Sequence, residues 1–162
     1  MKNKPKIIII LGPTASGKSD LAVLLAKKIK GEVVSADSRQ VYKGLSLGSG
    51  KITKKEMKGI PHHMLDVVNP KKTYSVHDFQ KGAIKAIDKI LQKGKVPIVC
   101  GGTGFYIDSI VKGTILPEVK PDLESRIMNQ ELSKEKLFEK LKKLDPKRAK
   151  EIDPDNKVRL IR

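Results

Sequence analysis

The residues best suited to chemistry lie in one glycine-rich segment near the start of the chain. Residues 12–19 match the phosphate-binding pattern G-x-x-x-x-G-K-[ST], between an apolar run and a helical pattern. Its glycines let backbone N–H groups turn toward phosphate oxygens, and the following helix adds the partial positive charge of its N-terminus. Lys18 is expected to neutralise phosphate charge, and the Ser19 hydroxyl is a candidate Mg²⁺ ligand. We therefore expect a di- or triphosphate to bind Gly12, Pro13, Thr14, Ala15, Ser16, Gly17, Lys18 and Ser19.

Asp37 directly follows a second predicted strand, residues 32–36, and should lie on the same rim as the phosphate loop. A carboxylate in this place can accept a proton from a nucleophile, bind Mg²⁺ through water, or cap Arg39. Its neighbours Ser38, Arg39, Gln40 and Tyr42 carry groups that can hydrogen-bond a base or a sugar.

A second loop without charge follows a third predicted strand, residues 96–100. The acidic residue that often ends this strand in phosphate-loop proteins is missing, and Gly101-Gly102-Thr103 stands there instead. The loop is suited to approach a ligand closely and donate hydrogen bonds, or it is simply a tight turn into the next helix.

Five other positions carry reactive or charged side chains. His62 and His63 are adjacent, so their side chains diverge and we do not expect a two-histidine metal site. Cys100 ends an apolar strand and is interpreted as a core residue. Arg159 and Arg162, three residues apart, form either a phosphate clamp or an exposed cationic face.

The elements that position these residues predict an α/β fold with a P-loop NTPase-like three-layer core and a parallel sheet. The apolar run at residues 6–11 is typical of a strand buried on both faces. Helical spacing of apolar residues indicates helices over 19–30, 75–93 and 105–111. Residues 43–73 are expected to be mostly loop with short elements. After a linker marked by Pro117 and Pro121, the chain reads as short charged helices, one with an apolar face of Leu137, Phe138, Leu141 and Leu144.

Composition narrows the class of protein. The chain has 162 residues, enough for one domain with a small appendage, and no run of 18 apolar residues, so we expect no membrane span. A single cysteine excludes a disulfide framework and favours a reducing, cytoplasmic setting. The net charge is +16, and residues 1–100 hold 20 Lys and Arg against 7 Asp and Glu. This excess of positive charge favours binding of polyanions such as nucleic acid. Alternatively, it reflects only a general lysine bias.

Several segments together resemble a known family. These are residues 12–19, Asp37 to Tyr42, Pro61-His62-His63, Tyr74 to Phe79, and Gly101 to Tyr106, in the order seen in tRNA dimethylallyltransferases. The resemblance implies transfer of a dimethylallyl group from dimethylallyl diphosphate to N6 of adenosine 37 in tRNA, with release of diphosphate. It makes residues 14–19 the diphosphate site, with Mg²⁺ at Ser19.

The same resemblance assigns the remaining roles. Asp37 would be the general base, Lys18 would act on the leaving group, and Thr103 would lie at the reacting centre. The anticodon arm of tRNA would contact Asp37, Ser38, Arg39, Gln40, Arg126, Arg159 and Arg162. Residues 1–114 would form the first part of the core, and residues 115–162 the start of a helical insertion.

Further expectations concern the completeness of the chain, its oligomeric state and alternative functions. Family members are about twice this length and the chain ends inside a predicted helix, so we expect a fragment. We also expect a monomer. A P-loop kinase of a nucleoside or small metabolite is the enzymatic alternative, and an RNA-binding module with a vestigial phosphate loop is the non-enzymatic one.

Overall fold

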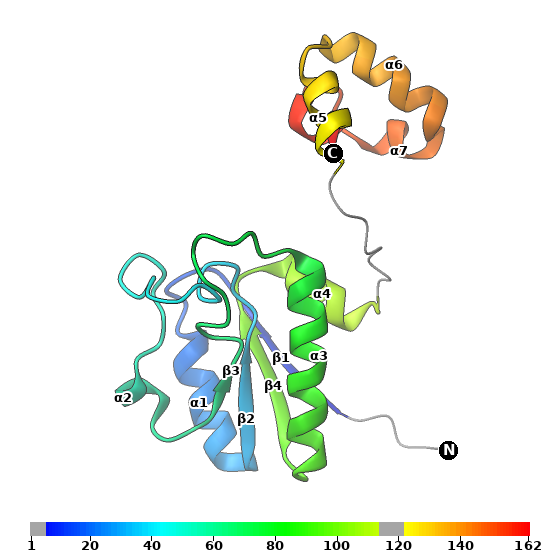
Figure 1. The fold of residues 1–162 in the computed structure, drawn as a ribbon. Helices are drawn as coiled ribbons and strands as arrows, with labels where there is room; N and C mark the ends of the chain where they lie inside the picture. The colour runs from blue at the N-terminus through cyan, green and yellow to red at the C-terminus, as the bar shows by residue number, and fades with distance from the viewer. Residues whose placement is uncertain (1–5, 114–121) are drawn as a thin grey trace, which may run out of the picture. The chain divides into compact units, whose positions relative to one another are not determined.

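A parallel four-stranded sheet forms the centre of the fold. The computed structural model describes residues 6–113 and 122–162. Strands β1 (Ile8–Leu11), β2 (Gly31–Ser35), β3 (His62–His63) and β4 (Val96–Gly101) lie in the order β1-β4-β2-β3. Every pair is parallel, so the carboxyl ends of the strands meet at one edge (Figure 1). The α/β class with a parallel sheet is confirmed.

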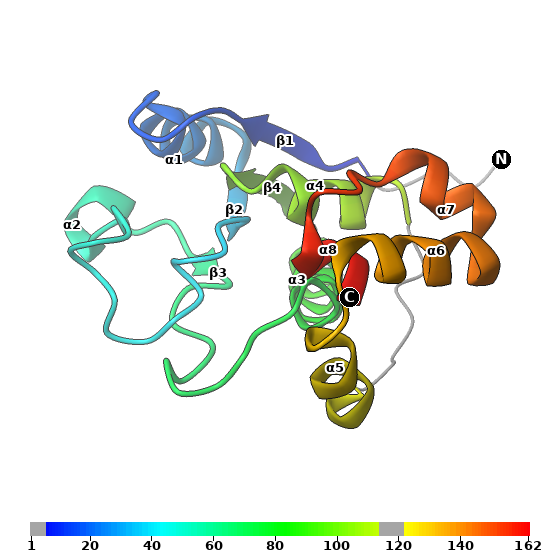
Figure 2. The same cartoon turned by 90° about the horizontal axis from the view of Figure 1, so that it is seen from above.

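Helices cover both faces of the sheet. Helix α1 (Lys18–Ile29) packs on one face, where Ala22 and Ala26 meet alternate side chains of β2 and β4. Helices α3 (Val76–Gln92) and α4 (Gly104–Val111) cover the other face (Figure 2). Phe79 of α3 stacks on Tyr106 of α4, with ring centroids 4.0 Å apart. The predicted three-layer core is thus present.

Local sequence signals explain where the elements begin. Ser75 and Asp78 form a reciprocal capping box that starts α3, because each side chain accepts a hydrogen bond from the other's backbone N–H. Residues 43–73 are mostly loop, as expected, and contain only α2 (Lys54–Met57) and β3.

The expectation for β1 is wrong on one face. Ile9 and Leu11 are 37% and 59% exposed, although the run was expected to be buried on both faces. The reason is that β1 pairs only with β4 among the described residues, and therefore lies at an edge of the sheet.

The chain divides into two compact units, Met1–Pro117 and Glu118–Arg162. The second contains the short charged helices that the sequence predicts: α5 (Leu123–Gln130), α6 (Lys134–Leu144), α7 (Pro146–Glu151) and α8 (Lys157–Ile161). Leu137 of α6 is buried, but Leu144 is 75% exposed, so the expected apolar face is only partly covered. The predicted boundary at residues 114 and 115 and the linker prolines lie outside the described residues. Within the described ranges no helix is long and apolar enough to cross a membrane.

Candidate active site

The glycine-rich loop joins β1 to α1 at the carboxyl edge of the sheet. Gly17 is the N-cap of α1 with φ of +76°, a conformation that favours glycine. A Cβ on Gly12 would lie 2.9 Å from Ser16 Oγ, so a side chain there would crowd the loop. Lys18 Nζ donates a hydrogen bond to Pro13 O at 2.7 Å, which folds the ammonium group back over the loop. The first turn of α1 and this ammonium group together make a site for an anion.

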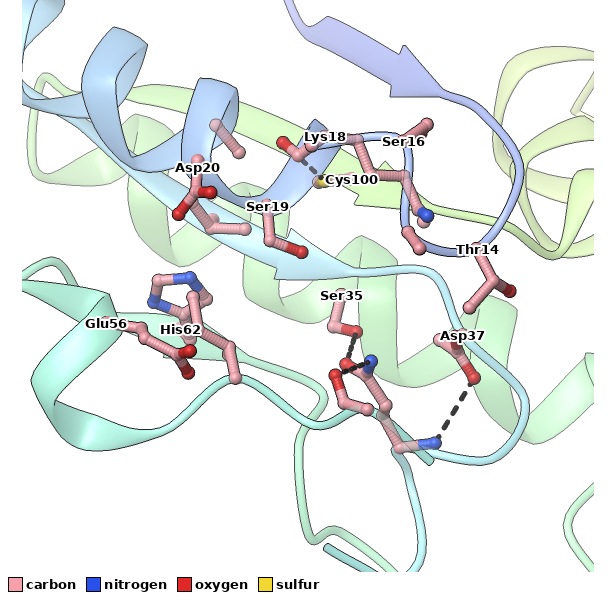
Figure 3. A pocket seen from close by; sticks show the side chains of 18 of the residues that line it. Thr14, Ser16, Lys18, Ser19, Asp20, Ser35, Asp37, Glu56, His62 and Cys100 are labelled. Carbon is pink, nitrogen blue, oxygen red and sulfur yellow. Dashed lines mark hydrogen bonds between the residues drawn. The ribbon is translucent and has the colours of Figure 1, made fainter. Parts of the chain in front are cut away.

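A cavity of about 390 Å³ opens beside this loop. The loop and the start of α1 form one wall, and residues between Asp37 and His62 form the opposite wall. In Figure 3, Thr14 and Asp37 lie toward one end of the cavity, and Glu56 and His62 lie toward the other. The cavity therefore joins the predicted phosphate site to the predicted general base.

Asp37 holds its carboxylate in a turn after β2. Its Oδ1 accepts hydrogen bonds from the backbone N–H groups of Arg39 at 2.8 Å and Gln40 at 3.3 Å. These contacts fix the orientation of the side chain through one oxygen, and they leave Oδ2 as the atom that can accept a proton. Asp37 is half-buried and lines the cavity.

The loop after β4 is tied to the turn that carries Asp37. Thr103 N–H donates to Ala36 O at 3.1 Å, and Thr103 Oγ1 accepts from the Ser38 N–H at 3.0 Å. Gly101 makes this approach possible, since a Cβ there would lie 2.1 Å from Ala36 O. Thr103 is thus adjacent to Asp37 in the fold, although it is not among the residues that line the cavity.

The residues expected to contact RNA do not all face outward. Ser38 and Arg39 are exposed, whereas the side chain of Gln40 hydrogen-bonds three groups of the protein. Arg126 and Arg159 lie in α5 and α8 of the second unit, and Arg162 directly follows α8. The three arginines therefore belong to the second compact unit, whereas the residues that line the cavity belong to the first.

Comparison with known proteins decides the family. Residues 40–162 match the sequence model described as IPP transferase. The chain belongs to the IPP transferase family. The matched span begins after the phosphate loop and Asp37. The phosphate loop and Asp37 are therefore evidence for the family that is independent of this match. The resemblance inferred from the sequence motifs is confirmed.

Known members of the IPP transferase family are similar to this chain over almost its whole length. The tRNA dimethylallyltransferase of Staphylococcus carnosus is 42% identical and that of Caldanaerobacter subterraneus 47%, with 99% and 97% of this chain covered. The tRNA isopentenylpyrophosphate transferase of Bacillus halodurans has a TM-score of 0.70 at 41% identity, over 98% of this chain and 54% of that one. A eukaryotic dimethylallyltransferase acting on tRNA has a TM-score of 0.85 at 32% identity. The similarity covers 97% of this chain and 40% of that one.

The chain spans about half the length of the curated relatives it matches, 53% and 51% for the two proteins named above. Their names favour a prenyl transferase and do not support the kinase alternative.

The cavity also contains residues that the sequence analysis did not assign to it. His62 Nδ1 donates to Ile60 O at 2.9 Å, so Nε2 remains as an acceptor. Burial lowers the pKa of His62, which keeps the ring neutral at pH 7. Glu56 at the same end is held by the N–H and hydroxyl of Thr53. No motif marks Glu56, and only the folded position of β3 reveals that His62 faces this space.

Cys100 is buried, as expected of a core residue, and also lines the cavity. Burial raises the pKa of its thiol to about 11, which does not suit a nucleophile.

The Ser19 hydroxyl is a side-chain oxygen near the loop that suits Mg²⁺. Ser19 lines the cavity in the first turn of α1. In the part of the chain that the structure describes, no three His, Cys, Asp or Glu residues cluster as a metal site. Mg²⁺ commonly takes only one or two protein oxygens and completes its shell with phosphate oxygens and water. The Ser19 hydroxyl fits that mode.

Proposed function

We propose that this protein transfers a dimethylallyl group from dimethylallyl diphosphate to N6 of adenosine 37 in tRNA. The observation that carries the proposal is the cavity that has the phosphate loop on one wall and Asp37 on the other. Membership of the IPP transferase family supports the same conclusion. Residues 14–19 bind the diphosphate, and the anticodon arm of tRNA presents the adenine.

The reaction exchanges one bond for another. The C–O bond of the allylic diphosphate breaks with its electron pair staying on the diphosphate, and the lone pair of N6 forms the new C–N bond. Asp37 Oδ2 accepts the proton that N6 loses, because Oδ1 is already engaged by the backbone.

The charge that develops on the leaving diphosphate is stabilised by the N–H groups at the start of α1 and by Lys18 after it leaves Pro13 O. Ser19 would hold a Mg²⁺, which supplies further positive charge at the diphosphate. Thr103 acts at the same rim as a positioning residue, since its hydroxyl accepts from the Ser38 N–H beside Asp37.

Transfer can be tested directly with the purified full-length gene product. Incubation with dimethylallyl diphosphate, Mg²⁺ and unmodified tRNA should yield N6-dimethylallyl adenosine, detected by mass spectrometry of the digested RNA. A tRNA with guanosine at position 37 is the matched control and should remain unmodified. Absence of product with every adenosine-37 tRNA tried would contradict the proposal, and phosphate transfer from ATP to a small hydroxyl compound would favour a kinase.

A further inference from the structure

The loop between β2 and α2 combines a fixed base with an exposed apolar tip. It spans residues 43–50, and Gly44 and Gly50 near its two ends have φ of +74° and +57°. These left-handed residues let the chain turn out from the carboxyl edge of the sheet and back again (cyan in Figure 1). We call residues 43–50 the rim loop.

Gln40 anchors the rim loop from inside. Its Nε2 donates to Ser49 O at 3.4 Å and Gly50 O at 3.2 Å, and its Oε1 accepts from Ser35 Oγ at 3.2 Å. Both amide hydrogens are therefore used within the protein, and donation from Gln40 Nε2 to a nucleotide would break one of these bonds.

Lys51 provides a second anchor at the end of the rim loop. Its side chain is only 5% exposed, and its ammonium group bonds Tyr42 O at 2.7 Å and Asp66 Oδ1 at 2.6 Å. A buried ammonium group with two such partners is costly to move. The base of the loop is consequently fixed before any ligand arrives.

The tip of the rim loop is apolar and open to solvent. Leu47 has a relative exposure of 103% and Leu45 of 48%. Exposed Arg39 and Lys43 precede this tip in the sequence, while Ser49 and Gly50 of the same loop line the cavity. An exposed apolar tip, with two cationic residues shortly before it in the sequence, thus belongs to a loop that lines the candidate active site.

An anchored loop with an exposed apolar tip suits an RNA substrate whose target base must be unstacked. Turning an adenine out of an RNA loop exposes the faces of neighbouring bases, and apolar side chains such as Leu can cover them. Nearby Lys and Arg side chains pair with the phosphates. Because the loop is anchored, little conformational entropy is lost on contact.

We propose that Leu45 and Leu47 of the rim loop pack against bases of the substrate RNA loop from which the target adenine has been turned out. Gln40 is a positioning residue that holds this surface through its bonds to Ser49 and Gly50. The inference rests on the proposed function, since it names the RNA surface of the same site.

The test uses the full-length protein and a tRNA with 2-aminopurine at position 37, whose fluorescence rises on unstacking. The double variant Leu45→Ala/Leu47→Ala should reduce the fluorescence rise and weaken tRNA affinity roughly tenfold, as expected for the loss of a base contact. Inorganic diphosphate binding should stay unchanged, because neither leucine lines the cavity. Leu24→Ala, at a 59% exposed position of α1, is the matched control and should behave like the wild type.

Gln40→Ala provides the second arm. It should reduce the fluorescence rise in the same direction, and its effect should be smaller when added to the double variant than when made alone. The isosteric polar change Leu47→Gln should also reduce the rise, which guards against a folding defect in the double variant.

A wild-type fluorescence rise and tRNA affinity in the leucine variants would overturn the proposal. If the wild-type protein transfers no dimethylallyl group to any tRNA, the proposed function fails and this inference falls with it. If transfer occurs and the leucine variants are unaffected, only this inference fails.

Discussion

Asp37 uses the two oxygens of its carboxylate differently. Oδ1 is held by two backbone N–H groups, and Oδ2 is the oxygen assigned to the proton of N6. Holding a base through one oxygen fixes its direction while the other oxygen remains free to react. The residue can therefore be changed chemically with little change in shape.

Asp37→Asn should abolish proton acceptance and keep the turn, because the amide oxygen can still accept from Arg39 and Gln40. We expect transfer to fall by roughly 10²- to 10⁴-fold, the range typical of a lost general base. Affinity for tRNA, measured by filter binding, should remain unchanged. Asp88→Asn, at an exposed position of α3, is the control. Retained turnover in Asp37→Asn would count against its role as base.

Lys18→Ala removes the only side-chain charge of the phosphate loop. We expect the rate of transfer to fall by roughly 10²- to 10³-fold, as when one transition-state donor is deleted. Diphosphate binding, measured by calorimetry, should weaken as well. Lys27→Ala on the exposed side of α1 serves as control. Unchanged transfer in Lys18→Ala would instead support an RNA-binding module with a vestigial loop.

Among the elements, the close approach of the end of β4 to Ala36, just after β2, requires glycine at position 101. A Cβ there would meet Ala36 O at 2.1 Å, whereas a Cβ on Gly104 would meet nothing within 4 Å. We expect Gly101→Ala to lower the free energy of unfolding by about 3 kcal/mol. Gly104→Ala should change it by less than about 1 kcal/mol. Urea denaturation of both variants measures the difference, and equal stabilities would show that the backbone yields easily.

A cluster of polar contacts around one buried carboxylate joins the amino ends of β2 and β4 to α3 and β3. Glu32 is 1% exposed, and its carboxylate bonds Lys95 at 2.8 Å, His63 at 2.8 Å and Lys93 at 3.1 Å. Burial alone would raise the pKa of Glu32, but the hydrogen bonds from these three groups outweigh it and lower the pKa to about 2. The ionised carboxylate therefore stabilises the folded state.

The pH dependence of stability follows from this lowered pKa. The contribution of Glu32 is present above its unfolded pKa of 4.5 and is lost as the pH falls toward 2. Glu32→Gln should lower the free energy of unfolding at pH 7 by roughly 2 to 3 kcal/mol, because Lys93 and Lys95 lose their anionic partner and His63 loses a carboxylate hydrogen-bond partner. Its stability should then fall less than that of the wild type between pH 4.5 and 2. Glu139→Gln, at an exposed position, is the control, and parallel pH profiles would refute the assignment.

For the whole molecule, the net charge of +16 sets how RNA binding responds to salt. Each phosphate neutralised by Lys or Arg releases counterions, so affinity falls as salt rises. We expect tRNA affinity to drop roughly 10³-fold or more between 50 and 200 mM salt if six or more phosphates are contacted. Filter binding across this range measures the slope, and thermal unfolding in the same buffers checks that the fold is intact. A flat response would leave the lysine excess without a role in RNA binding.

The sequence predicted those parts of the molecule that depend on local signals. The phosphate loop, the capped helix that starts at Ser75 and the glycine turn after residue 100 each carry their own chemistry in a few adjacent residues. The exposure of Ile9 and the inward direction of Gln40 were not predictable in this way. Both depend on which strand or loop lies beside the residue, and that is fixed by contacts distant in sequence.

The bond between Lys18 and Pro13 O has a consequence for how the loop meets its ligand. In the free protein the ammonium group already has an acceptor, so an arriving anion competes with a carbonyl of the same loop. Binding is then an exchange of one oxygen for another. The bond therefore keeps the loop compact when no ligand is bound. A singly charged anion such as chloride gains little interaction energy by displacing the carbonyl, whereas a multiply charged anion gains much.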